Sequence, residues 1–252
     1  MFGLKGKKVL VTGSTRGIGL EIAKKFHEND CLVGINGRNN SKVDSVVKSF
    51  DSDRVINCSG DLESLKEVDS VVGKFINGFQ EIDILICNVG SGSSAKPGDE
   101  KQEDWDKMLS VNLFSATRIV EAAKKYLIRS KGSIICISSI CGIEVVPGAP
   151  VAYSSAKAAL NLFVKTSSRP LGSLGVRINA IAPGNIIFED SVWDKKIKKD
   201  KESVNKLLNE EVPLQDFGSP QDVANLATFL SSPLASNITG EVMITDGGQT
   251  RS

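Results

Sequence analysis

The stretch that decides the fold lies near the start of the chain and reads Thr12-Gly13-Ser14-Thr15-Arg16-Gly17-Ile18-Gly19. It stands between a short apolar run and a longer amphipathic segment, where a strand is expected to give way to a helix. The first N–H groups of a helix have no partner within it, and the helix dipole favours anions beside them. Gly13 permits a sharp turn, Gly17 lets a ligand approach the backbone, and Gly19 lets helix and strand pack closely. The GxxxGxG spacing in this position predicts a site for the diphosphate of a dinucleotide.

Short apolar runs recur outward from this turn, at residues 8–12, 31–36, 54–58, 82–87, 133–138, 176–181 and 241–245. They are rich in Val, Ile and Leu and do not alternate with polar residues, which is typical of strands covered on both faces. Longer amphipathic stretches separate them, such as residues 62–76 and 111–128. The alternation predicts one α/β domain over residues 1–252, a Rossmann-type doubly wound sheet of seven mainly parallel strands with helices on both faces.

Residues 183–213 do not fit the alternation, because they contain no strand-like run. Their apolar residues stand at roughly helical spacing, and a long excursion of this kind in a compact domain is typical of a lid or binding loop. We therefore expect a substrate-lid insertion at about residues 185–212. The segment also carries lysines, which we expect on a solvated helix face. These are Lys195, Lys196, Lys198, Lys199 and Lys201.

The composition argues against several classes of function. Lys and Arg number 31 and Asp and Glu 30, so the formal charge of +1 leaves no basic field for nucleic acid. No apolar stretch is long enough for a membrane span, and the first residues lack an apolar signal core, so a cytoplasmic location is expected. His27 is the one histidine, which removes Ser-His-Asp hydrolysis and most zinc chemistry. The five cysteines form no CxxC pair, which predicts buried free thiols and no metal site.

A second motif suggests proton transfer. Tyr153 and Lys157 stand four residues apart in a helical segment, so they share one face. A tyrosine hydroxyl titrates near about pH 10, and a neighbouring ammonium is expected to lower that pKa toward the neutral range. Ser139, fourteen residues before Tyr153, follows a strand-like run, where its hydroxyl can orient a carbonyl oxygen. The alternative for a YxxxK pattern alone is an amphipathic helix with an exposed lysine.

Taken together, these motifs resemble the short-chain dehydrogenases/reductases. The glycine turn is similar to the family's TGxxxGIG fingerprint. Further matches follow in family order over nearly the whole chain: Asn88-Val89-Gly90, Asn112, Ser138-Ser139, Tyr153 to Lys157, Asn179 to Gly184 and Thr239 to Gly248. The resemblance implies hydride transfer between a nicotinamide cofactor and a carbonyl or secondary alcohol. The pattern is most similar to 3-oxoacyl-carrier-protein reductases and to sugar, polyol and steroid reductases.

The resemblance also implies catalytic roles for four residues. Ser139 would orient the carbonyl, and Tyr153 would act as the acid in reduction and the base in oxidation. Lys157 would also bind the cofactor ribose. Asn112 would bend a helix and hold a water that relays protons from the lysine; its alternative is a plain polar residue inside a helix. Ser138 is expected to satisfy backbone groups at a strand end.

The cofactor preference can be predicted from the end of the second strand. NAD-preferring sites usually present an acid there for the ribose 2′-OH, but the corresponding residue is Gly37. Arg38 follows it, and Arg16 lies in the glycine turn; two guanidiniums suit a 2′-phosphate. We predict NADP(H), with NAD(H) possible if both arginines merely face solvent. By resemblance, Asp61 and Leu62 contact the adenine. The full expected cofactor set is Gly13, Ser14, Thr15, Arg16, Gly17, Ile18, Gly19, Arg38, Asp61, Leu62, Asn88, Gly90, Tyr153, Lys157, Pro183, Gly184 and Ile186.

Some residues depart from the family pattern at the cofactor. Val89 replaces the usual Ala and is expected to crowd the cofactor. Phe188 stands where a Thr commonly contacts the nicotinamide carboxamide, which leaves the backbone of Ile186 as the expected anchor.

Other departures concern assembly and partners. Pro170 lies in the helix that begins near Tyr153 and predicts a kink or an end before it. In relatives this helix packs against its twin, so a homodimer or homotetramer is expected. Arg129 occupies one of two places where basic residues dock a carrier protein, but Leu174 holds the other, and Arg129 could equally cap a helix.

We therefore expect an NADPH-dependent oxidoreductase that reduces a carbonyl, or oxidises a secondary alcohol, on a small molecule such as a 3-oxoacyl thioester. One alternative is a sugar, polyol or sugar-acid dehydrogenase/reductase. An alternative of another class is a catalytically silent NADP(H)-binding scaffold or sensor. A carrier-protein partner is left open, and neither nucleic acid nor membrane is an expected partner.

Overall fold

The computed structural model describes residues 2–251 and contains one sheet of seven strands, all paired in parallel. Their spatial order is β3-β2-β1-β4-β5-β6-β7, so the chain reverses its direction of travel across the sheet between β1 and β4. Ligands of such sheets bind beyond the carboxyl ends of the strands at this switch point. The expected seven-stranded Rossmann-type sheet is confirmed. The strands are β1 (Lys8–Val11), β2 (Leu32–Ile35), β3 (Val55–Asn57), β4 (Ile84–Cys87), β5 (Ser133–Ile137), β6 (Arg177–Pro183) and β7 (Val242–Thr245).

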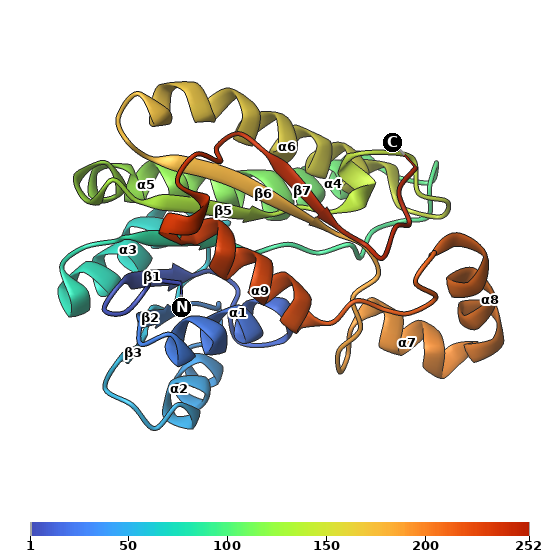
Figure 1. Ribbon diagram of the computed structural model, residues 1–252. Helices are drawn as coiled ribbons and strands as arrows, with labels where there is room; N and C mark the ends of the chain where they lie inside the picture. The colour runs from blue at the N-terminus through green and yellow to red at the C-terminus, as the bar shows by residue number, and fades with distance from the viewer. Residues whose placement is uncertain (1, 252) are drawn as a thin grey trace.

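Helices cover both faces of this sheet (Figure 1). One core contains residues of α3 (Leu65–Phe79), α5 (Ser115–Ser130) and α6 (Val151–Gly172). The other core contains residues of α1 (Gly17–Glu28), α2 (Asn40–Ser49) and α9 (Pro220–Ser231). Successive residues of β1 enter the two cores in turn, which explains why the strand-like runs are apolar throughout.

A π-helical turn, η1 (Ser110–Phe114), joins α4 (Gln102–Leu109) to α5, so the stretch expected as one helix over 111–128 is irregular at its start. Asn112 stands in the middle of this turn and is fully buried. Its amide nitrogen donates to the carbonyl of Met108, one turn earlier, at 3.1 Å. The irregular turn thus falls at the asparagine for which the family resemblance implied a bend.

Of the two outcomes expected at Pro170, a kink or an end of the helix, the end is wrong, because α6 continues to Gly172. The proline lies only two residues from the helix end, so its ring removes a single backbone bond, the one to the carbonyl of Thr166. Both Pro170 and Thr166 are exposed, and water can satisfy that carbonyl.

The excursion over residues 185–212 contains two helices, α7 (Val192–Lys199) and α8 (Lys201–Glu211). Asp200 separates them in an extended conformation, and its carboxylate caps α8 by accepting the N–H of Ser203 at 3.0 Å. Figure 1 shows this pair, in orange, projecting beyond the carboxyl ends of the strands. Two short 3₁₀ turns, η2 (Ile140–Gly142) and η3 (Pro233–Ala235), complete the elements. Across residues 2–251, none of the helices combines the length and apolarity that a membrane crossing requires.

Candidate active site

A cavity of about 960 Å³ opens at the carboxyl ends of the strands, beside the switch point. It brings together nearly all of the site residues predicted from the sequence, which come from the glycine turn, the ends of β2 to β6 and α6. Three predicted residues do not line it: Ser14, Gly17 and Asn112. The predicted residues that do are Gly13, Thr15, Arg16, Ile18, Gly19, Arg38, Asp61, Leu62, Asn88, Gly90, Ser139, Tyr153, Lys157, Pro183, Gly184 and Ile186.

The glycine turn has the geometry that its sequence predicts. Gly13 and Gly17 adopt positive φ angles of 59° and 55°, where a side chain is strained. Gly19 lies so close to the backbone of Gly13 and the amide of Asn88 that a methyl group would collide with both. Ser14 faces the interior instead of the cavity, and its hydroxyl donates to the carbonyl of Val11 at 2.7 Å. Ser14 therefore supports the turn from beneath.

A buried amide that the sequence reasoning missed, Asn36, ties the turn to its neighbours. Its oxygen accepts the N–H of Gly13 at 3.2 Å. Its nitrogen donates to the carbonyls of Cys58 and Gly60 at 2.9 and 3.1 Å. One side chain at the end of β2 thus links the turns that follow β1 and β3. The signal in the sequence was a lone amide directly after an apolar strand.

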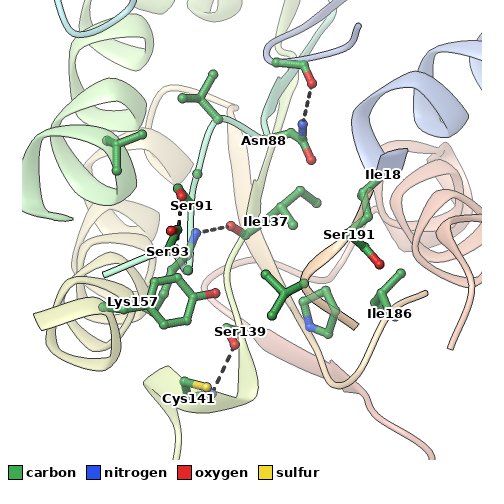
Figure 2. A pocket seen from close by; sticks show the side chains of 18 of the residues that line it. Ile18, Asn88, Ser91, Ser93, Ile137, Ser139, Cys141, Lys157, Ile186 and Ser191 are labelled. Carbon is green, nitrogen blue, oxygen red and sulfur yellow. Dashed lines mark hydrogen bonds between the residues drawn. The ribbon is translucent and has the colours of Figure 1, made fainter. Parts of the chain in front are cut away.

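Asn88 serves the turn from the other side. Its side-chain nitrogen donates to the carbonyls of Thr12 and Gly13, each at 3.0 Å, and Figure 2 shows one of these two bonds. The resemblance placed Asn88 beside the adenosine ribose, and the structure gives it a second task, holding the turn in place. Val89 next to it lines the cavity and packs against Gly13, so the larger side chain does narrow the groove there.

The residues predicted to carry the chemistry converge at the other end of the cavity. Lys157 is 3% exposed, and its ammonium donates to the carbonyl of Ile137 at 2.9 Å. The ammonium nitrogen lies 6.0 Å from the centre of the Tyr153 ring. Figure 2 shows Lys157 and Ser139 on one side of the pocket, facing Ile18 and Ile186 across it.

The side chains of Asn112 and Lys157 both lie next to Gly90. A Cβ built on Gly90 would lie 3.0 Å from the Asn112 side-chain oxygen and 3.1 Å from the Lys157 nitrogen. The asparagine does not line the cavity, and it is held from behind by Ser91, whose N–H it accepts at 3.0 Å. A side chain on residue 90 would therefore be tightly packed against both polar atoms.

Burial controls the protonation of the tyrosine and the lysine. Desolvation raises the pKa of Tyr153 to about 12; a hydrogen bond with Ser139 lowers it in part, and Cys141 raises it further. Desolvation also lowers the pKa of Lys157 to about 8. The expectation that Lys157 makes Tyr153 unusually acidic is therefore wrong for this structure. The ammonium is directed to the carbonyl of Ile137, and the loss of water around the phenol outweighs the hydrogen bond from Ser139.

Phe188 and Asn185 define the wall near the expected nicotinamide carboxamide. The Phe188 ring lies over Gly17, so closely that a methyl group on this glycine would collide with it. Phe188 offers no side-chain hydrogen bond, but Asn185 lines the same cavity and is 8% exposed. Its amide nitrogen has no partner within residues 2–251. A glycine turn, a large groove and an unpaired amide fit a nicotinamide dinucleotide.

All five lysines of the excursion are exposed, as the sequence suggested, but they differ in what they lie beside. Lys195, Lys196 and Lys199 line the cavity, whereas Lys198 pairs with Asp194 at 2.8 Å. Periodicity shows which residues share a helix face but not which face meets the cavity. Arg129, by contrast, is not among the lining residues, and its guanidinium donates to the carbonyl of Gln80 at 2.7 Å, near the amino end of β4.

Comparisons with known proteins agree with this geometry. A family described as enoyl-(acyl carrier protein) reductase matches residues 13–250. The 3-oxoacyl-(acyl-carrier-protein) reductase FabG of Rickettsia felis is 36% identical over 251 residues, which are 98% of each chain. Isoepoxydon dehydrogenase patN of Penicillium expansum is 34% identical over 98% of this chain and 95% of its own.

A solved structure, L-sorbose reductase from Gluconobacter frateurii complexed with NADPH and L-sorbose, matches with a TM-score of 0.93 and 29% identity. The match covers 100% of this chain and 99% of that one. A 7α-hydroxysteroid dehydrogenase complexed with NADH and 7-oxo glycochenodeoxycholic acid matches with a TM-score of 0.89 and 28% identity, over 100% and 97% of the two chains. The chain therefore belongs to the short-chain dehydrogenase/reductase family, whose members are oxidoreductases that act on CH–OH or carbonyl groups with NAD(P)H.

Proposed function

We propose that the chain is an NADPH-dependent reductase that converts a small-molecule carbonyl into a secondary alcohol, and catalyses the reverse oxidation. One observation carries the proposal: Ser139, Tyr153 and Lys157 line the same cavity as the glycine turn. A bound dinucleotide and the side chains proposed to transfer the proton would thus lie in the same cavity. A silent scaffold would not need a buried lysine at that point, because burying an ammonium costs stability.

The proposed roles follow from the contacts. NADPH, when bound, supplies the hydride. The Ser139 hydroxyl orients the substrate carbonyl, and Tyr153 donates its proton to the carbonyl oxygen during reduction. A raised pKa suits this direction, because the phenol remains protonated at neutral pH. Lys157 resupplies the proton through the space beside Gly90, where Asn112 positions a water.

The geometry at the end of β2 supports NADPH over NADH. A Cβ built on Gly37 would lie 2.8 Å from the Thr15 methyl group, so an acidic side chain there would displace Thr15. Arg38 and Arg16 line the cavity on either side of this point. The side chain of Arg38 is 72% exposed and lies 3.5 Å from Glu63, a weak pairing that leaves it free to bind a 2′-phosphate.

Replacing these arginines is expected to separate the two cofactors. Hydrogen bonds to charged groups contribute about 1.5–3 kcal/mol each, so R16A and R38A should each raise the KM for NADPH about tenfold or more. The KM for NADH should stay within about twofold, because NADH lacks the 2′-phosphate. Steady-state kinetics with both cofactors measures the effect, and R169A on the exposed part of α6 is the control. A wild-type enzyme that prefers NADH would contradict the proposal.

The proposed reaction is tested by a panel of ketones and alcohols, assayed with NADPH and NADP. The first candidate substrate is a 3-oxoacyl thioester, because of the similarity to FabG. The second is a sugar, polyol or sugar acid, because of the structural similarity to L-sorbose reductase. Turnover of any member supports the proposal. Tight NADPH binding without turnover of any member would favour a sensor or scaffold instead.

We further propose that residues 185–212 act as the substrate lid and that the chain forms a homo-oligomer in the cytoplasm. The lid proposal is supported by the cavity-lining residues of this segment, which include Trp193 and Leu207. The oligomer proposal is supported by Leu162, an apolar side chain of α6 that is 61% exposed.

A further inference from the structure

Helix α7 turns one continuous face toward the cavity. The residues of the helix that line the cavity include Val192, Lys195, Lys196 and Lys199. Their spacing of three, four and seven residues is that of a single helix face. The ion pair between Asp194 and Lys198 lies off this stripe. The lid helix therefore presents three of its cations to the cavity.

These three cations have no counter-charge of their own. Within residues 2–251, none of the three forms an ion pair with a carboxylate. The chain as a whole is nearly neutral at +1, so the excess of positive charge is local to the cavity. The charged residues that line it are six cations, Arg16, Arg38, Lys157, Lys195, Lys196 and Lys199, and three acids, Asp61, Glu63 and Asp190.

Two of the three acids lie away from the lysines, and the third, Asp190, lies two residues before α7, so three lysines face one acid at the substrate end. Asp61 and Glu63 lie in the loop after β3, at the expected adenine end, and Glu63 pairs with Arg38. The expected 2′-phosphate would engage Arg16 and Arg38. The diphosphate would lie on the helix N-terminus at the glycine turn. The lysines of α7 are thus left for a ligand other than the cofactor.

Lys196 lines the cavity that contains the residues proposed to carry out the reaction. Its ammonium lies 4.2 Å from the centre of the Trp193 ring, and this ring packs against Phe217 at 5.5 Å. Burial raises the pKa of the Cys141 thiol; hydrogen bonds with Ser139 and with the Cys141 backbone lower it, as do the charges of Lys157 and, least of all, Lys196. The Cys141 N–H donates to the Ser139 hydroxyl at 3.2 Å. A cation held on a tryptophan therefore lines the same cavity as the serine proposed to orient the substrate.

We propose that the substrate is a small molecule carrying an oxyanionic group, a carboxylate or a phosphate, and that the lysine face of α7 binds this group. The inference rests on the proposed carbonyl reduction and adds its substrate class. A lysine presents a mobile point charge, so three of them can hold an oxyanion without fixing one geometry. Such binding would draw α7 over the substrate.

The test compares matched anionic and neutral ketones in the NADPH-loaded enzyme. One pair is 4-oxopentanoate and its methyl ester, and the other is dihydroxyacetone phosphate and dihydroxyacetone. Wild-type kcat/KM should be at least about tenfold higher for the anionic member of one pair, and that pair identifies carboxylate or phosphate as the group. The triple variant K195Q/K196Q/K199Q should lose this advantage while its activity on the neutral member stays within about twofold.

Three controls make the result specific. K198Q removes the same charge from a position of α7 that does not line the cavity and should leave the preference unchanged. K196R keeps the cation and should retain most of the preference lost in K196Q. The KM for NADPH should not change in any of these variants. A rise of this KM in the triple variant would assign the lysines to the cofactor and overturn the proposal.

A binding measurement separates this inference from the proposed function. Tryptophan fluorescence, measured in a W105F background, reports on Trp193, which carries Lys196 on its ring. If neither the four ketones nor any member of the wider panel is reduced, but the anionic ketones quench the fluorescence of wild type and not of the triple variant, the anion site stands and the proposed reaction fails. Equal kcat/KM for anionic and neutral ketones would sink the inference while leaving carbonyl reduction intact. Reduction of ketones only when they are attached to a carrier protein would also contradict the inference and leave carbonyl reduction intact.

Discussion

Y153F is expected to lower kcat/KM for carbonyl reduction about 10³-fold while leaving the dissociation constant for NADPH within about twofold. Phenylalanine fills the same partly buried space but has no proton to donate to the carbonyl oxygen. The loss should appear in kcat, because orientation by Ser139 and cofactor binding remain. Steady-state kinetics together with fluorescence titration of NADPH measures both quantities.

The chain offers a matched control for this change. Tyr126 is the second of its two tyrosines and lies on α5, where Lys125 and Arg129 approach its ring. It does not line the cavity, so Y126F should keep full activity. Activity of Y153F within tenfold of wild type would show that another group delivers the proton.

K157M is expected to abolish turnover and, in the same protein, to raise the free energy of unfolding by about 2 kcal/mol at pH 7. Burial lowers the pKa of Lys157 from 10.5 to about 8, so the folded state carries a desolvated charge. Methionine keeps the length of the side chain and removes that charge. Part of the gain is offset, because the carbonyl of Ile137 loses the hydrogen bond that the ammonium donates at 2.9 Å.

The sign of the pH dependence follows from the lowered pKa. Below about pH 8 both states hold the proton, and the cost of burying the charge is present in full. Between about pH 8 and 10.5 the unfolded state binds more protons than the folded state, so the stability of wild type rises with pH. The advantage of K157M should therefore shrink from pH 7 to pH 9.5.

Urea denaturation at these two pH values measures the effect, and K165M on the exposed face of α6 is the control that should change little. A K157M variant that is less stable than wild type at pH 7 would mean that the Ile137 hydrogen bond outweighs the desolvation of the ammonium. A residue that lowers stability where it supports turnover is common at active sites.

The architecture could be predicted because it depends on local periodicity. Short apolar runs without alternation are typical of strands covered on both faces, and seven of them separated by amphipathic segments indicate the sheet that is found. The glycine turn could be read in the same way, since the positive φ of Gly13 and Gly17 is a local requirement. Predicting the end of α6 failed because a proline near a helix terminus costs little when the freed carbonyl is exposed.

The amino-acid sequence by itself determined the order of the elements, the turn that faces a dinucleotide, and the four-residue spacing that puts Tyr153 and Lys157 on one helix face. Only the tertiary structure decided that Asn36 ties two turns together and that burial governs the pKa of Tyr153. It also decided that three lysines of α7 face the cavity. The physical reason is that periodicity and spacing are properties of neighbours along the chain. Desolvation and the orientation of a helix depend on what distant segments place around it.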